Sequence, residues 1–364
     1  MERPTVLLDR YVLRQFIFTL IFSVGALSII FIVVDLLESL DDFLDQKASI
    51  SVILTYYVSY LPNIFKLLLP IGMLLASLFT VGRLSGANEI TAMRSGGQSL
   101  FRFMVPLLLF GVLLSVGQIY FNGWVVPAAN AKKFTIERTY LGRSTGGGSL
   151  NMLYFRDSPL RNVSIASYDA AARQARTVTI ETYSSEAQPR LLSRIDAPMM
   201  KWDTTRAVWT MPTAVQRVFR GDTIVMSDLR NATVPFGIRH DQIISLQRNV
   251  EELTFDELKD YISTMKKGGK DTRRQEIEYF GQWAFPVANA IVVLIAVPFA
   301  SVRRRGGVAV HIAAAMGLSF GYIAFTKIVQ SVGVSTDYDA AMVAWSANVL
   351  FFLVGVVILL RTRT

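Results

Sequence analysis

Six long apolar stretches constrain what this chain can fold into more than any other feature. A helix needs about 20 mainly apolar residues to cross the hydrocarbon core of a bilayer. The stretches that meet this requirement are Gln15–Val34, Ile50–Val81, Phe101–Tyr120, Gly281–Val302, Val308–Val332 and Ala341–Leu360. Three lie on each side of a more polar middle segment. The sequence therefore predicts a membrane α-helical protein with six transmembrane helices and a domain inserted between the third and the fourth.

The first apolar stretch resembles a signal peptide only at its start. Arg3, Arg10 and Arg14 give it a basic lead, but no small-residue cleavage site follows, because the chain continues directly into the acidic stretch that begins at Asp35. A cleaved signal needs both features. We expect this stretch to be retained as a transmembrane helix.

Composition and motifs exclude most catalytic chemistry. The chain has no cysteine and only two histidines, His240 and His311, so disulfides, thiolate catalysis and cysteine or histidine metal centres are not expected. No phosphate-binding loop, nucleophile elbow or zinc-protease motif is present, and Ser144–Ser149, STGGGS, is read as a mobile loop because no Lys-Ser/Thr pair follows it. We therefore expect a transport subunit, not an enzyme, with no catalytic residue, no metal site and no bound cofactor.

The distribution of charge predicts the orientation in the membrane. The net charge is +9, and arginines cluster at 3–14, 83–102, 303–305 and 361–363, whereas acids dominate 35–45 and 337–339. Basic residues in short loops favour the cytoplasmic side. Both termini and the loops at 82–102 and 303–307 are therefore predicted to be cytoplasmic, and residues from about 122 to 278 to lie outside. The scatter of the charge gives no reason to expect nucleic acid as a partner.

The middle segment is predicted to be all-β, as a sandwich or jelly-roll-like domain. Its short alternating runs are 152–156, 162–168, 177–182, 191–195, 201–202, 207–211 and 214–219, most of them bounded by Gly, Pro, Asp or Asn. After them Thr254 and Glu257 form the pattern of a capping box, which opens a helix that runs to Lys267. The expected domains are 1–124, with the first three spans, 125–252, the β domain, 253–274, the connecting helix, and 275–364, with the last three spans.

A short polar segment, Asn88–Leu100, lies between the second and third spans on the predicted cytoplasmic side. Asn88 is expected to cap a small amphipathic helix, with Glu89 in its first turn, and Gly96-Gly97 to end its first part. The helix can lie on lipid headgroups or dock into a soluble partner. It is less basic than interfacial anchors usually are, which favours a partner.

Several motifs resemble the permeases of the lipopolysaccharide-export ABC transporter. The chain matches them in L-P-x7-P-I-G-M-L-L from Leu61 to Leu75, in N-E-I-T-A-M-R-S-G-G from Asn88, and in Leu253–Ile262, Phe285–Phe299 and Ala340–Phe352. The resemblance covers nearly the whole chain. That family has F-type and G-type subunits, and Leu253–Ile262 with Tyr279, Phe280 and Trp283 is more similar to the G-type.

The resemblance implies a mechanism and a set of partners. A permease of this kind pairs with a sister permease and with a dimer of a cytoplasmic ATPase, which uses ATP and Mg²⁺. It extracts lipopolysaccharide from the outer leaflet of the bacterial inner membrane and passes it through its periplasmic jelly roll to bridge proteins. The lipid enters between the first span of one permease and the fifth span of the other.

The resemblance also implies three groups of functional residues. The residues implied in coupling to the ATPase are Asn88, Glu89, Ile90, Met93 and Arg94. Glu89 is expected to pair with a basic residue of the ATPase, and Ile90 and Met93 are expected to hold the helix in place by apolar contacts. The residues expected to line the lipid cavity are Phe18, Phe22, Gly25, Ile29, Lys66, Met316, Phe320, Ile323 and Lys327. The residues expected to line a periplasmic lipid conduit are Leu153, Phe155, Ile165, Ile180 and Trp209. Further inward-facing candidates are Val163, Val178, Val215 and Val218.

Alternatives remain at each of these groups. Lys66 lies deep in a span and needs either a structural partner or the substrate, and Lys327 either meets a lipid phosphate or extends to the outer headgroups. The β domain is either open to acyl chains or a packed core. G-type relatives carry bases near the outer end of the first span, where this chain has Asp35, Glu38, Asp41 and Asp42, so direct phosphate pairing there is not implied.

Two other functions stay open at this point. One is a permease of another extruding ABC system, such as lipoprotein release, which would share the ATPase but not the cargo. The other is a membrane-anchored periplasmic scaffold.

Overall fold

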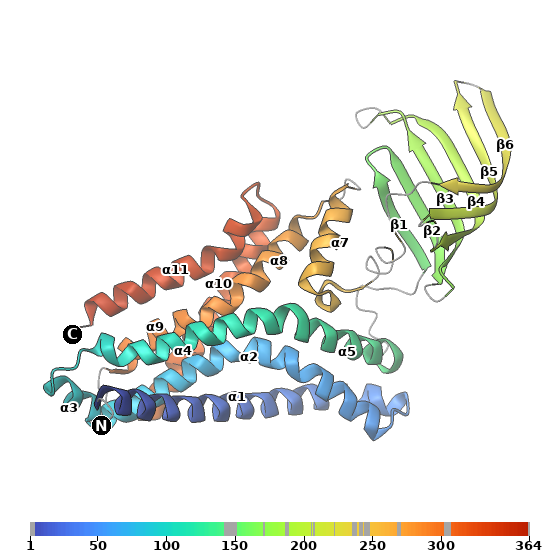
Figure 1. Ribbon diagram of the computed structural model, residues 1–364. Coiled ribbons are helices and arrows are strands. Elements are labelled where there is room, and N and C mark those ends of the chain that lie inside the picture. Colours follow the sequence, from blue (N-terminus) through green and yellow to red (C-terminus); the bar gives the residue numbers. More distant parts are fainter. Residues whose placement is uncertain are drawn as a thin grey trace. The chain divides into compact units, whose positions relative to one another are not determined.

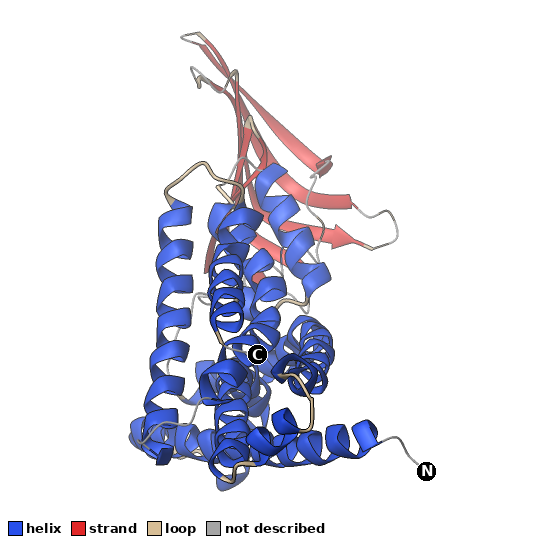
Figure 2. Cartoon of the chain, turned by 90° about the vertical axis from the view of Figure 1, so that its left-hand side faces the viewer, coloured by secondary structure: helices blue, strands red, loops and turns tan. Residues whose placement is uncertain are grey.

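A computed structural model shows how the chain divides (Figure 1). It describes residues 4–141, 151–169, 172–185, 189–204, 206, 208–221, 223–234, 239, 243, 248–267, 271–301 and 307–362. The chain separates into two compact units, residues 1–142 with 276–364, and residues 143–275. The first unit is helical and the second contains the strands (Figure 2).

The helical elements follow the apolar stretches but extend well beyond them. They are α1 Pro4–Asp45, α2 Ile50–Gly86, α3 Glu89–Ser95, α4 Leu100–Tyr120, the π-helical turn η1 Phe121–Val125, α5 Val126–Tyr140, α8 Arg273–Ala284, the 3₁₀ turn η3 Phe285–Val287, α9 Ala288–Ser301, α10 Gly307–Val334 and α11 Ala340–Arg361. Among the described residues, five helical segments are long and apolar enough to cross a membrane: Leu7–Asp45, Ile50–Gly86, Leu100–Tyr140, Arg273–Ser301 and Ala340–Arg361. The remaining predicted stretch lies within the 28-residue helix α10. The prediction of a multi-span helical protein is confirmed, and the count of six spans stays a prediction.

The expected start of the β domain at residue 125 is wrong. Residues 126–140 form α5, which continues the third span, and the first described strand begins at Asn151. Pro127 follows the π-helical turn η1 in this continuous helix, and because it has no amide hydrogen it donates no hydrogen bond to the preceding turn. Lys133 and Glu137, one turn apart, pair at 3.2 Å and support the helix.

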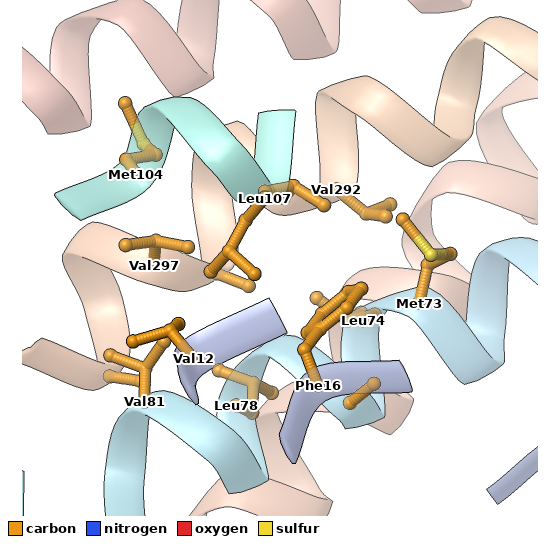
Figure 3. Close-up of a cluster of buried hydrophobic side chains, with 14 of the residues drawn as sticks. Val12, Phe16, Met73, Leu74, Leu78, Val81, Met104, Leu107, Val292 and Val297 are labelled. Carbon is orange, nitrogen blue, oxygen red and sulfur yellow. The ribbon is translucent and has the colours of Figure 1, made fainter. Parts of the chain in front are cut away.

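The core of the helical unit lies between α1, α2, α4 and α9. Figure 3 shows Val12 and Phe16 of α1 meeting Leu74 and Leu78 of α2, with Leu107 of α4 completing the cluster. All five side chains are at most 1% exposed. Small residues allow close approach, since a Cβ on Gly111 would lie 3.3 Å from the backbone of Ala290 in α9. α2 is thus the central helix of the unit.

The strands form one six-stranded antiparallel sheet in sequence order, β1-β2-β3-β4-β5-β6. They are β1 Asn151–Ser158, β2 Arg161–Asp169, β3 Gln174–Tyr183, β4 Leu191–Asp203, β5 Val208–Arg220 and β6 Thr223–Val234. The inserted all-β domain is confirmed. The described strands form a simple meander and not a Greek key, because each strand pairs with the next one in the sequence.

Strand boundaries differ from the sequence patterns in two places. The sequence patterns predict strand ends at Pro198 and Pro212, but both prolines lie inside long strands, β4 and β5. They fall where the β4–β5 ladder is interrupted, between the pairs Asp196↔Val215 and Lys201↔Thr210, so their missing amide hydrogens cost no pairing there. β6 was not predicted, because its mixed sequence TIVMSDLRNATV lacks a clear alternation.

One face of the sheet carries the apolar core of this unit, whose members include Val163, Ile165, Val178, Ile180 and Trp209. The second unit also contains η2 Val250–Glu252 and α7 Phe255–Lys267. The predicted capping box of α7 is confirmed. The backbone N–H of Thr254 donates to Glu257 Oε2 at 2.9 Å, and the backbone N–H of Glu257 donates to Thr254 Oγ1 at 3.3 Å.

Candidate functional site

The segment between α2 and α4 forms the short helix α3 and a tight return. Asn88 precedes α3 with φ +59°, in the left-handed region that asparagine tolerates, and its side chain makes no capping bond. The prediction that Asn88 caps the helix is therefore wrong. The predicted end is confirmed, since Gly96 follows the last helical residue and Gly97 adopts φ +84°.

The apolar side of α3 faces its own chain. Ile90 is 5% exposed and belongs to the core cluster of the helical unit, and Met93 packs against that cluster. Ile90 is turned toward its own chain and Met93 is partly buried, and whether the two also hold α3 against a partner stays a prediction. The exposed residues of α3 are Thr91, Ala92, Arg94 and Ser95.

Two polar contacts tie this segment to the start of α1. The Tyr11 hydroxyl donates to Glu89 Oε2 at 3.2 Å, at the beginning of α3. Arg102, in the first turn of α4, donates through Nη1 and Nη2 to the two carboxylate oxygens of Asp9, at 3.0 and 2.6 Å. Glu89 thus has a partner within the chain. No local sequence pattern indicates these pairs, because the partners are 78 and 93 positions apart.

One face of α1 is exposed along its length. Phe18 is 74% exposed, Phe22 69% and Ile29 65%, and a Cβ added at Gly25 would meet no atom within 4 Å. Their spacing places them on one side of the helix. The predicted stripe on α1 therefore faces away from the rest of the chain, toward lipid or a partner.

The predicted stripe on α10 is only partly present. Met316 is 52% exposed, Phe320 63%, and Lys327 is also exposed, whereas Ile323 packs against a small cluster around Tyr322. α10 and α1 both pack on α2. Whether the two exposed faces border a cavity for substrate stays a prediction.

Lys66 lies partly buried in α2, and the structure explains its backbone. Its carbonyl would normally accept from residue 70, but Pro70 has no amide hydrogen. The side chain of Gln118 in α4 supplies the missing donor at 3.0 Å, and Gln118 Oε1 in turn accepts from Asn289 Nδ2 in α9 at 2.6 Å. Sequence reasoning missed Gln118 and Asn289, although Pro70 signals a freed carbonyl four residues earlier.

A buried ionic cluster lies near the other end of α1. The Lys133–Glu137 side chains are only 10% and 5% exposed, Glu137 also accepts from the Tyr56 hydroxyl at 3.1 Å, and Lys133 Nζ lies 4.1 Å from the centre of the Tyr60 ring. Asp35 accepts from the Tyr57 hydroxyl at 3.1 Å. The acidic end of α1 is therefore joined to a tyrosine-rich face of α2, while Glu38 and Asp41 stay exposed.

The predicted conduit residues of the β domain form its core. Phe155, Ile165, Ile180 and Trp209 are each at most 4% exposed. The side chain of Leu153 lies outside the described residues. Val163 and Val178 join the core, whereas Val215 and Val218 are half-buried. Whether lipid enters this core stays a prediction.

A chain-wide comparison decides the family. The sequence model described as "Lipopolysaccharide export system permease LptF/LptG" matches residues 10–361. The chain belongs to the LptF/LptG family.

Individual LptG proteins are similar over most of the chain. The lipopolysaccharide export system permease protein LptG of Haemophilus influenzae is 21% identical over 247 residues, 66% of each chain. LptG of Escherichia coli strain K12 is 21% identical over 314 residues, 84% of each chain. These relatives agree with the predicted likeness to the G-type subunit. As a member of the LptF/LptG family, the chain is a multi-pass membrane permease and not an enzyme.

Proposed function

We propose that this chain is the G-type permease subunit of an ATP-driven exporter that extracts lipopolysaccharide from the outer leaflet of the bacterial inner membrane and passes it to a periplasmic bridge. The observation that carries the proposal is the match of the LptF/LptG family to residues 10–361. The two exposed apolar faces on α1 and α10 supply surfaces for acyl chains. The family match favours this function over lipoprotein release and over a passive scaffold.

The proposed partners follow from what the sequence lacks and what the surface offers. A sister permease completes the transmembrane part, and a cytoplasmic ATPase dimer binds ATP and Mg²⁺, for which this sequence has no phosphate-binding loop. The exposed side of α3, with Thr91, Ala92 and Arg94, is the surface we assign to the ATPase. In the orientation that we propose for the chain in the membrane, both termini and α3 are cytoplasmic, and the β domain is periplasmic.

The lipid route follows the exposed faces. Acyl chains lie along Phe18, Phe22 and Ile29 of α1, and Lys327 of α10 supplies a positive charge for a lipid phosphate. A charge-assisted contact of this kind is short and strong. The acids at the end of α1 bind headgroups through bridging cations or repel them toward the β domain.

Purification from the native membrane tests the proposal. The complex is isolated through a tag on this chain, its protein subunits are identified, and the retained lipid is analysed by mass spectrometry. We expect an ATPase, a sister permease and lipopolysaccharide. Lipoprotein in place of lipopolysaccharide would identify the other extruding system, and recovery of periplasmic proteins without an ATPase would identify a scaffold.

A further inference from the structure

Two polar contacts join the first turns of α1 to α3 and to the start of α4. Tyr11 donates to Glu89 at the start of α3, and Asp9 pairs with Arg102 at the start of α4. Between these two polar contacts, Ile90 belongs to the same core cluster as Val12, one residue after Tyr11. The start of α1 is therefore attached to α3 through Glu89 and to the start of α4 through Arg102.

The Asp9–Arg102 pair has the geometry of a strong contact. Two parallel hydrogen bonds, at 3.0 and 2.6 Å, join the guanidinium to both carboxylate oxygens. The side chains are 38% and 31% exposed, so water weakens the pair relative to a buried one. A bidentate pair fixes direction as well as distance, which a single exposed ion pair does not. It holds the starts of α1 and α4 in one arrangement, and the Tyr11–Glu89 hydrogen bond joins α1 to α3.

α1 is suited to carry a movement along its length. It is a single helix of 42 residues without internal proline, about 63 Å long at about 1.5 Å per residue. α2, by contrast, contains Pro62 and Pro70. The face of α1 that carries Phe18, Phe22 and Ile29 lies on the same continuous helix as Asp9 and Tyr11. A displacement of its first turns therefore moves the whole exposed face.

We propose that Asp9 and Tyr11 couple α3 to the lipid-facing wall, so that α1 transmits the movement of the ATPase contact to the bound lipid. The proposal rests on the proposed function, in which α3 contacts the ATPase and α1 contacts lipopolysaccharide. It assigns a positioning role to Asp9, Tyr11 and Arg102, none of which touches nucleotide or lipid. Its consequence is that loss of the contacts separates ATP hydrolysis from lipid release.

A charge exchange tests this role in the complete complex, reconstituted in liposomes with lipopolysaccharide. The measured quantity is lipopolysaccharide released per ATP hydrolysed, in complexes whose assembly has been verified. Asp9→Arg and Arg102→Asp should each lower this ratio by about fivefold or more, at the low end of typical coupling between sites. The double variant should recover most of it. Arg10→Asp, on the same turn and exposed, is the matched control and should leave the ratio unchanged.

Unchanged ratios in both single variants, or a double variant as poor as the worse single one, would overturn the proposal. If the unaltered complex binds no ATPase or releases no lipopolysaccharide, the proposed function itself fails, which is a different result.

A cross-link provides a second test, because it replaces the ion pair between Asp9 and Arg102 by a covalent link. The chain has no cysteine, so Asp9→Cys with Arg102→Cys creates one defined pair, which a short bismaleimide can join. If α1 and the α3 segment move together, the joined complex should release lipopolysaccharide at a rate similar to that of the unaltered complex. Before joining, this variant lacks the ion pair and should release less lipopolysaccharide per ATP hydrolysed. A ratio that does not rise on joining would contradict transmission through this contact.

Discussion

At the scale of single residues, Lys327 is the exposed cation on α10 to which we assign the lipid phosphate. The side chain lies on the helix that also exposes Met316 and Phe320. A contact between a lysine and a phosphate depends on the sign of the charge. Lys327→Glu should therefore reduce lipopolysaccharide export by about tenfold, an energy of about 1.4 kcal/mol, and Lys327→Gln should reduce it less. The measurement is export from liposomes that contain the assembled complex.

A lysine that only extends to the headgroups would respond differently. Export would then tolerate Lys327→Gln and show only a small loss with Lys327→Glu. Normal export in both variants would remove Lys327 from the lipid route.

In the β domain, Tyr168 should make stability depend on alkaline pH. Burial raises the pKa of its hydroxyl from 10.0 to about 12. Because the folded pKa lies above the unfolded one, this group contributes stability that is complete below pH 10 and lost as pH rises toward 12. Tyr168→Phe should remove at most about 3 kcal/mol of that pH dependence, measured by unfolding of the purified protein in detergent. An identical alkaline profile in both proteins would contradict this assignment.

At the scale of elements, substitutions at buried positions of α3 should affect folding, and substitutions at its exposed positions should affect docking of the ATPase. Ile90 is buried and Ala92 is exposed, on the same short helix. Ile90→Ala should lower the free energy of unfolding by about 2 kcal/mol or more, because it leaves a cavity. Ala92→Asp should change that free energy by less than about 0.5 kcal/mol, but should abolish binding of the ATPase. Retained binding with Ala92→Asp would place the ATPase elsewhere.

Local signals predicted elements where the chain interacts with its own neighbours in sequence. The capping box of Thr254 and Glu257, and the glycine end of α3 at Gly96, both follow from patterns within a few residues. The same patterns failed where distant contacts decide the outcome. Asn88 lies in the left-handed region and does not cap α3, and Pro198 and Pro212 lie in strands because the ladder is interrupted opposite them.

The candidate site shows the same division. Spacing alone placed Phe18, Phe22 and Ile29 on one exposed face of α1, because a helix repeats its faces regularly. Spacing did not show that Ile90 and Met93 face the core of their own unit. That result depends on which neighbours α3 meets, and one apolar side of a short helix fits a partner or its own chain equally well.

At the scale of the whole molecule, the long apolar stretches predicted the membrane fold and the inserted β domain. They did not predict how far the helices extend, because polar residues at 35–45 and 126–140 continue α1 and α5 once tyrosine and ionic partners pair with them. Long-range pairs such as Asp9–Arg102 are invisible in a single sequence.

The orientation of the chain gives a prediction at this scale. Asp41 and Ser95 are both exposed, and the natural chain contains no cysteine that would add background. In intact cells, Asp41→Cys should react with a membrane-impermeant maleimide, and Ser95→Cys should react only after the membrane is opened. Ser39, two residues earlier in α1, is fully buried and therefore unsuitable for labelling. Labelling of Ser95→Cys from outside would reverse the proposed orientation.

We propose that this permease moves lipopolysaccharide with the energy of ATP that a partner subunit hydrolyses. The most direct measurement follows lipopolysaccharide leaving liposomes that contain this chain, its sister permease and the ATPase, with the periplasmic bridge proteins as acceptor. We predict release that requires ATP and this chain, and that stops when Ala92→Asp removes the ATPase contact. Release that proceeds equally without ATP, or ATP-driven release of lipoprotein with lipopolysaccharide retained, would contradict the account.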